Sequence, residues 1–286
     1  MSIPGVGLPG VSPLHPPGSL SMRIAVCAKQ VPDPDIPPSQ FKIDSSGLSV
    51  VPPSGVAPVI NGFDLNAVEA AVRIRESTGL EVQITVISVG SGFALDVMKK
   101  ALAMGADELV LVDDSAASNL DAGGTARVLH AALEKIGPYD LVLCGRQASD
   151  WDQSHVPILL AELLQLPCVT VARKLTVQDG KVEIERVIAD GYQVIEVQFP
   201  ALVTVSNELG EPRYPTLRGI MAAGRKQPQR STLAELGLDP GLLEPGLKLL
   251  GMEVPESRSQ VEFIEGEDDE EKGRNLVLRL REERLI

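Results

Sequence analysis

Residues 145–155 concentrate the groups of this chain best suited to holding a ligand. The segment follows a strand-like apolar run and precedes a helical pattern. It combines a glycine with amide, carboxylate, hydroxyl and guanidinium groups: Gly145, Arg146, Gln147, Ala148, Ser149, Asp150, Trp151, Asp152, Gln153, Ser154 and His155. Glycine lets backbone approach a ligand, a helix N-terminus attracts anions, and Gln147 and the carboxylates suit adenine and ribose edges. The pattern favours a nucleotide site. The alternative is a polar loop in which Ser154 only caps the next helix.

A second candidate loop, Gly90-Ser91-Gly92, lies between another strand-like run and a helix start. Free backbone N–H groups at such a position can hold phosphate. The loop does not continue as Gly-x-Gly-x-x-Gly, because position 95 is Leu, so a dinucleotide fingerprint is not supported. A tight turn is the alternative interpretation.

Side chains for covalent or metal chemistry are not arranged for it. No serine has a Gly-x-Ser-x-Gly setting and no Gly-x-x-x-x-Gly-Lys-Ser loop occurs, which argues against a hydrolase and a P-loop ATPase. Cys27, Cys144 and Cys168 are not at metal-ligand spacing, and the three histidines are scattered, so we expect no metal site. An odd cysteine count without a secretion signal indicates a reducing compartment, and we expect a cytoplasmic location. A nucleotide site without catalytic side chains predicts a carrier rather than an enzyme.

The net charge of the chain argues against two classes of partner. The formal net charge of −13 argues against nucleic acid and anionic membranes, which need a basic face, and no apolar run approaches the length of a transmembrane helix. Residues 213–226 are the exception, since Arg218, Arg225 and Lys226 surround a few apolar side chains there. Tyr214, Leu217, Ile220 and Met221 supply that apolar surface. The segment suits gripping a partner, and an amphipathic helix whose apolar face joins the core is the alternative.

An alternation of strands and helices must position these loops. Strands are expected at residues 23–30, 82–89, 109–112, 140–144 and 168–171. Helices are expected from Asn61 or Asp64 onward, from residue 95 to Gly105, from Asp121 to Gly137, and over 156–166. Residues 32–58, with many prolines, are expected to form a long loop. Continuous apolar strands separated by helices predict a doubly wound parallel sheet, whose ligands bind at the carboxyl ends of the strands.

The pattern changes after residue 174. Short runs at 175–178, 182–187, 193–198 and 201–205 predict an antiparallel appendage to the parallel sheet. The last segment carries an acidic run before basic residues, which suits a helix, although residues 276–280 also fit a strand. We therefore expect a disordered leader over 1–21, a nucleotide-binding α/β domain over 22–227, and a linker with a C-terminal arm over 228–286. Met22 is an alternative start to Met1.

Several blocks of the chain, in order, resemble the β subunit of electron transfer flavoprotein. They are Cys27-Ala28-Lys29-Gln30-Val31, Ala101-Leu102-Ala103-Met104-Gly105-Ala106-Asp107, Gly145-Arg146-Gln147-Ala148, Glu211-Pro212-Arg213-Tyr214, Thr216-Leu217 and Ile220-Met221. The resemblance runs from Met22 to about Lys226. It implies a doubly wound, adenine-nucleotide-hydrolase-like fold and a heterodimer whose α subunit holds most of an FAD and receives the C-terminal arm.

The resemblance also implies partners. Electrons would come from flavin dehydrogenases, such as the acyl-CoA dehydrogenases of fatty acid oxidation, and leave towards a quinone reductase or similar acceptor. Residues 213–226 would be the recognition loop, with Leu217 as its anchor. In a eukaryote the location would be the mitochondrial matrix. A free-standing adenine-nucleotide-binding regulatory protein of the same fold is the alternative function.

Site residues carried over by match would hold AMP, or a second FAD in electron-bifurcating forms: Cys27, Asn61, Gly62, Phe63, Asp64, Val89, and Gly145 through Val156. Phe63 aligns with an aromatic that lies against the flavin ring, and a core phenylalanine is the alternative. His155-Val156-Pro157 departs from the family pattern at the phosphate-binding helix start. Since proline lacks a backbone donor, the choice between AMP and FAD stays open.

Overall fold

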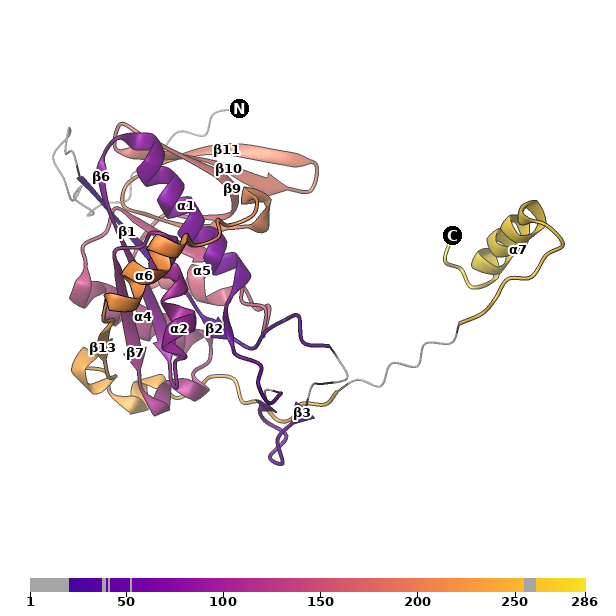
Figure 1. Cartoon of the computed structure of the whole chain (residues 1–286), viewed down its shortest axis with the longest axis horizontal. Helices are drawn as coiled ribbons and strands as arrows, with labels where there is room; N and C mark the ends of the chain where they lie inside the picture. Colours follow the sequence, from indigo (N-terminus) through magenta and orange to yellow (C-terminus); the bar gives the residue numbers. More distant parts are fainter. Residues whose placement is uncertain (1–20, 38–39, 41, 52, 255–260) are drawn as a thin grey trace.

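A nine-stranded sheet with helices on both faces forms the body of the chain (Figure 1). In this computed structural model, the described residues are 21–37, 40, 42–51, 53–254 and 261–286. The sheet order is β11-β10-β9-β12-β8-β1-β6-β7-β13. Its strands are β1 (Ser21–Cys27), β6 (Glu81–Gly90), β7 (Glu108–Asp113), β8 (Leu141–Gly145), β9 (Cys168–Gln178), β10 (Lys181–Ile188), β11 (Gly191–Gln198), β12 (Ala201–Val205) and β13 (Gln229–Ser231).

Smaller elements complete the fold. Two short antiparallel ladders pair β2 (Gln30–Val31) with β5 (Val59–Ile60) and β3 (Lys42–Ile43) with β4 (Val50–Val51). The helices are α1 (Gly62–Thr78), α2 (Leu95–Met98), α3 (Lys100–Met104), α4 (Ala122–Ile136), α5 (His155–Leu163), α6 (Leu217–Arg225) and α7 (Asp269–Glu282). Single 3-10 turns are η2 (Ser115–Asn119), η3 (Asn207–Leu209), η4 (Ala234–Leu236) and η5 (Pro240–Leu243).

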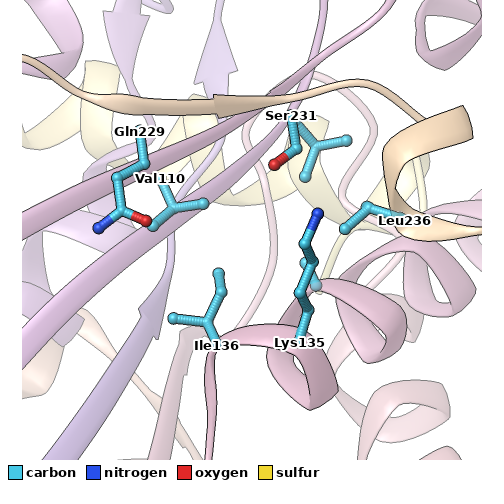
Figure 2. A pocket seen from close by; sticks show the side chains of 8 residues that line it. Val110, Lys135, Ile136, Gln229, Ser231 and Leu236 are labelled. Carbon is cyan, nitrogen blue, oxygen red and sulfur yellow. The ribbon is translucent and has the colours of Figure 1, made fainter.

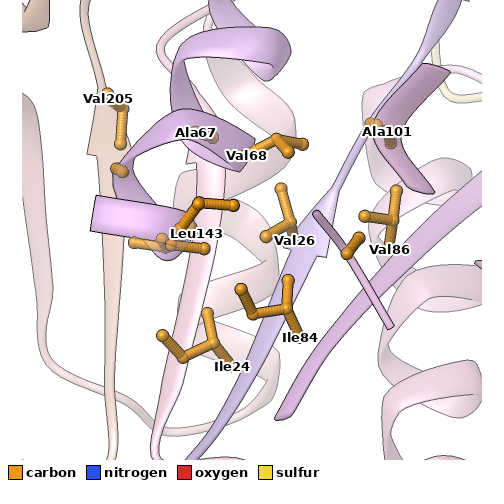
Figure 3. Close-up of a cluster of buried hydrophobic side chains, with 14 of the residues drawn as sticks. Ile24, Val26, Ala67, Val68, Ile84, Val86, Ala101, Leu143 and Val205 are labelled. Carbon is orange, nitrogen blue, oxygen red and sulfur yellow. The ribbon is translucent and has the colours of Figure 1, made fainter. Parts of the chain in front are cut away.

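Strand β1 shows how the sequence produces a sheet that is covered on both faces. Its side chains alternate between the faces: Ile24 and Val26 join the core under α1 and α3 (Figure 3), while Ala25 and Cys27 join the core under α4 and α5. Because both faces are buried, the strand is continuously apolar from Ile24 to Cys27 rather than alternating. The predicted doubly wound parallel sheet is confirmed.

The strand order reverses at β1. This strand pairs in parallel with β6 on one side and with β8 on the other. The chain moves outward from β1 through β6 to β7, then crosses back to β8. The carboxyl ends of β1 and β8 therefore mark the switch point, where ligands of such sheets bind.

Several local predictions were wrong. Residues 168–171 and 175–178 form one strand, β9, which bends at Val171, where φ is 61°. Residues 201–205 are not part of the antiparallel appendage, because β12 pairs in parallel with both β8 and β9. Every residue of β12 is buried, which is typical of a central parallel strand. The helix expected from residue 95 to Gly105 is two short helices, α2 and α3, that meet at Lys99.

The C-terminal region differs in part from expectation. Residues 229–231, expected to lie in a linker, add strand β13 to the edge of the sheet. The terminal helix is confirmed as α7, which Asp268 caps by accepting a hydrogen bond from the Glu271 N–H. α7 lies apart from the sheet and buries none of its residues (Figure 1). The leader expected over residues 1–21 lies outside the described residues, apart from Ser21 in β1.

Candidate functional site

Three stretches of chain meet at the switch point of the sheet. β1 ends at Cys27, β8 ends at Gly145, and Cys27 lies directly opposite Cys144 in the parallel ladder. Helix α1 begins beside them, since Asn61 N–H donates to the Lys29 carbonyl at 2.9 Å. The sheet thus brings residues 27–31, 61–64 and 145–156 together; we call them the strand-end cluster.

Asp64 joins the two strand ends. Its carboxylate accepts the Lys29 N–H at 2.8 Å through Oδ2 and the Gly145 N–H at 3.0 Å through Oδ1. The side chain is buried, and this burial raises the pKa of Asp64 to about 7, although the N–H bonds oppose the rise. The resemblance placed Asp64 in a ligand contact; in the structure both oxygens bond to backbone instead.

Gly145 has no room for a side chain. A Cβ there would collide with Asp64 Oδ1 and would lie 2.8 Å from Asp64 N and Phe63 C. Only glycine lets β8 end this close to the start of α1. The close approach is between two parts of the chain, whereas the sequence suggested an approach to a ligand.

Asn61 fastens residues 145–155 to α1. Its Nδ2 donates to the Gln147 carbonyl at 2.8 Å, and its Oδ1 accepts the Ser149 N–H at 3.2 Å. Asn61 occupies the N-cap position of α1 but makes no side-chain cap bond there, contrary to the expected cap. The side chain is fully buried, so the amide is committed to holding the loop.

Polar side chains within the loop bond mainly to one another. Gln147 Nε2 donates to Asp152 Oδ1 at 2.6 Å, and Ser154 Oγ donates to Gln147 Oε1 at 3.4 Å. Ser154 precedes α5 with φ at 57°, and its side chain does not cap the helix. The polar-loop interpretation expected such a cap. Trp151 is half exposed, and Gln153 and His155 are also exposed.

Lys29 belongs to the cluster although the sequence argument did not name it as a site residue. Besides its N–H bond to Asp64, its Nζ pairs with Asp150 Oδ2 at 2.5 Å. The signal was available, because Lys29 follows β1 directly within the matched Cys27–Val31 block.

Arg146 carries the unpartnered donor of the cluster. Its guanidinium carbon lies 4.6 Å from the centre of the Phe63 ring, and its Nε is buried without a hydrogen-bond partner. Such a donor is costly to bury alone and suits an anionic or carbonyl oxygen. Phe63 is partly buried, so it is not an ordinary core phenylalanine.

Cys27 and Cys144 turn their thiols towards each other at the carboxyl ends of β1 and β8. Contact with Cys27 and burial raise the pKa of the Cys144 thiol well above its usual value. Both cysteines are buried, so they behave here as small apolar side chains.

The second loop, Gly90-Ser91-Gly92, leads into a very short helix. Ser91 Oγ bonds to Ser118 Oγ at 2.5 Å, and Gln30 Oε1 accepts the Ala94 N–H at the start of α2. Helix α2 has only four residues, which favours the tight-turn interpretation. Val89 lies at the end of β6 and packs partly against the α4–α5 core.

The apolar side chains of residues 213–226 point outward. Tyr214 is 91% exposed, Leu217 75%, Ile220 52% and Met221 57%, whereas Ala223 alone of α6 is buried. The alternative of an apolar face joining the core is therefore wrong. Gly219 packs so closely on the Ala103 carbonyl that a Cβ would collide with it.

A cavity of about 270 Å³ opens elsewhere, between β7, β13, α4 and η4 (Figure 2). Lys135 and Ser231 face it from opposite sides, and none of the predicted site residues lines it: its walls are Val110, Val112, Ala132, Lys135, Ile136, Gln229, Ser231 and Leu236. Sequence reasoning missed this cavity, because residues 229–236 were expected in a linker. Within the described ranges, no cluster of His, Cys, Asp and Glu could hold a metal, and no helix could span a bilayer.

Comparison with known proteins agrees with the resemblance. The electron transfer flavoprotein domain family matches residues 50–236. The electron transfer flavoprotein subunit beta of Thermoanaerobacterium thermosaccharolyticum is 39% identical over 93% of this chain and 100% of its own length. The caffeyl-CoA reductase-Etf complex subunit CarD of Acetobacterium woodii is 37% identical over the same shares, and the subunit beta of Megasphaera elsdenii is 36% identical over 88% and 94%. The chain belongs to the electron transfer flavoprotein β-subunit family.

Proposed function

We propose that this chain forms a heterodimer with an electron transfer flavoprotein α subunit and passes electrons from flavin dehydrogenases, such as acyl-CoA dehydrogenases, towards a quinone reductase or similar acceptor. The α subunit holds most of the FAD, and the flavin supplies the redox chemistry. This chain contributes burial, orientation and docking. α7 and the segment before it cover the α subunit.

The observation that carries the proposal is the surface of residues 214–221. Tyr214 stands exposed just before helix α6, and Leu217, Ile220 and Met221 stand exposed on that helix, which packs against α3 on another face. Exposed apolar groups clustered on a rigid support are typical of protein interaction sites. Arg218 and Arg225 beside them suit an acidic rim on the dehydrogenase, and Leu217 is the anchor.

The strand-end cluster is the proposed adenine-nucleotide site. Its fit rests on the buried Arg146 Nε without a partner and on the position at the switch point, beside the start of α5. Residues Cys27, Asn61–Asp64, Val89 and 145–156 line this site. Arg146 donates to the ligand, the loop backbone follows it, and Phe63 lies against the FAD that the α subunit holds. AMP occupies the site in this proposal.

A second candidate function is favoured by one comparison. CarD is named as a subunit of a caffeyl-CoA reductase-Etf complex and is 37% identical to this chain, between the 39% and 36% of two relatives named electron transfer flavoprotein subunit beta. A chain of that kind would deliver electrons to a CoA-ester reductase within a stable complex. The site would then hold a second FAD in place of AMP.

Purification of the tagged chain with its natural partners distinguishes these functions. One FAD and one AMP per heterodimer supports the simple carrier, and two FAD with a co-purified reductase supports the second candidate. A colourless homo-oligomer that binds only adenine nucleotide would overturn both and favour the regulatory protein. Leu217→Ala should slow reduction by the dehydrogenase at least about tenfold while the flavin content stays unchanged. An unchanged rate contradicts the anchor role.

A further inference from the structure

One buried carboxylate holds the base of residues 214–221. Glu69, on α1, is 3% exposed and accepts three bonds from Arg213: from the backbone N–H at 3.1 Å, from Nε at 2.8 Å, and from Nη2 at 3.2 Å. Arg73 Nε donates to Glu69 Oε1 at 2.7 Å, the oxygen that also accepts from Arg213 Nη2. The carboxylate therefore bonds both to the backbone and to the side chain of the residue that precedes Tyr214.

Arg213 is fixed from two sides. Its guanidinium also reaches Glu76, about two turns further along α1, with Nη1 at 2.6 Å and Nη2 at 2.8 Å from the two oxygens. The carboxylates of Glu69 and Glu76 thus both accept hydrogen bonds from the planar guanidinium of Arg213, a geometry that lysine cannot reproduce. Arg73 Nη1 binds the Leu209 carbonyl at 2.9 Å, which secures the chain before the segment.

The far end of the segment is fixed separately. Gly219 and Ala223 pack on α3, and Lys226 Nζ donates to the Asp107 carbonyl at 2.7 Å. The exposed apolar side chains therefore stand between two fixed points. The Arg213 end relies on ion pairs and the Lys226 end on packing.

We infer that Glu69 and Arg213 are positioning residues that hold Tyr214 and Leu217 in the conformation that a dehydrogenase binds. The inference rests on the proposed function of residues 214–221. A preorganised anchor binds more tightly because the conformational entropy of the segment is already lost before the partner binds. Neither residue belongs to the strand-end cluster, and neither presents its own side chain as the anchor, since Arg213 points back onto α1.

The test uses the assembled αβ complex, with Glu69→Gln and Arg213→Lys as variants. Glu69→Gln keeps the size of the side chain and removes its negative charge. Arg213→Lys keeps the positive charge and removes the planar guanidinium group. Amide hydrogen exchange of residues 213–217 should accelerate about tenfold. The KM for the complex as substrate of an acyl-CoA dehydrogenase from the same cells should rise about tenfold, with kcat and the flavin spectrum unchanged.

Arg230→Lys is the matched control, because Arg230 pairs with Asp113 at 2.8 Å across a long sequence separation without touching the segment. It should alter neither measurement. Unchanged exchange in both Glu69→Gln and Arg213→Lys would overturn the inference. So would faster exchange with an unchanged KM, provided that Leu217→Ala raises the KM. If Leu217→Ala has no effect, the docking function fails by itself, and the exchange data still decide whether Glu69 orders the segment.

Discussion

Two buried carboxylates on α1 hold the strand-end cluster and the proposed docking segment, residues 213–226, in different ways. Asp64 accepts the backbone N–H groups of Lys29 and Gly145 at the strand-end cluster, and burial raises its pKa to about 7. Glu69 lies further along the helix beneath the docking segment; burial opposes its ionisation too, but the bonds from Arg213 and Arg73 outweigh it and hold its pKa below the usual value. One helix therefore holds the strand-end cluster through backbone hydrogen bonds and the proposed docking segment through ion pairs.

The difference follows from what each carboxylate must hold. At the strand ends the partners are two backbone segments at fixed positions in the sheet, so two N–H bonds suffice. The docking segment lies outside the sheet, and ion pairs from long side chains span the gap to α1. Changes at the strand ends should therefore affect the fold, and changes at Glu69 should affect the segment.

The largest effect is expected for Gly145→Ala. The added Cβ collides with Asp64 Oδ1 and the backbone of Phe63, none of which can move without shifting α1 from β8. Overpacking of this kind costs about 3 kcal/mol. The Tm of the αβ complex should fall strongly, and its AMP content should fall with it.

Gly224→Ala is the control for that change. Gly224 lies in α6 with open space around its Cβ position, so alanine should leave the Tm unchanged or raise it slightly. Equal Tm values for the Gly145→Ala and wild-type complexes would contradict the close approach of β8 to α1.

A smaller effect is expected for Asp64→Asn. The amide offers one acceptor where two N–H groups point, and its NH₂ group faces the second N–H. Leaving one buried donor unpaired costs about 1–3 kcal/mol. The Tm should fall measurably, whereas Asp44→Asn, in an exposed turn, should have little effect. Full tolerance of Asp64→Asn would show that Asp64 does not join the strand ends.

The sequence predicted the parallel part of the fold well because local pattern and global burial agree there. β1, β6, β7 and β8 are largely apolar runs separated by helices, and Asp121 caps α4 as expected, by accepting the Gly124 N–H. β12 was misassigned because its length and residue types fit an edge strand as well as a central one. Only its pairing with β8 and β9 distinguishes them.

The sequence predicted which segments converge at the candidate site, but not the hydrogen-bonding role of each residue in them. Parallel strand ends meet at one edge, so the convergence of residues 27, 61–64 and 145–155 follows from topology. Hydrogen-bond partners more than eighty residues apart do not, and so Asn61 appeared to be a helix cap when its amide in fact binds the loop. The same limit hid Glu69, because a glutamate in a helix usually faces solvent.

The pH dependence of stability should have opposite signs for the two carboxylates. The folded pKa of Glu69 is lowered, so its stabilisation is complete above the unfolded value of about 4.3 and is lost as the pH falls through the folded value. The folded pKa of Asp64 is raised, so its contribution is complete below about 3.9 and is lost as the pH rises to about 7. Arg73, Arg213 and Glu76 are the charged groups around Glu69.

Tm measurements from about pH 3 to 8 test this contrast in wild type, Glu69→Gln and Asp64→Asn. The advantage of wild type over Glu69→Gln should stay constant down to about pH 4.3 and shrink below it, and its advantage over Asp64→Asn should shrink towards pH 8. If both differences change in the same direction, the two carboxylates do not have the opposite environments that the structure shows.

The smallest effect on the Tm is expected for a change at Lys29. This residue makes both a backbone hydrogen bond, to Asp64, and an ion pair, with Asp150. Its N–H donates to the buried carboxylate of Asp64. Its ammonium pairs with Asp150, and 45% of the Lys29 side chain is exposed. Water and salt screen such a pair, which leaves at most about 1 kcal/mol. Lys29→Met keeps the N–H and removes the ammonium, so it should lower the Tm far less than Asp64→Asn, and the difference should vanish at high salt. A large, salt-resistant loss would instead mean that the charge of Lys29 holds the loop, so that the strand-end cluster depends on ion pairs as the docking segment does.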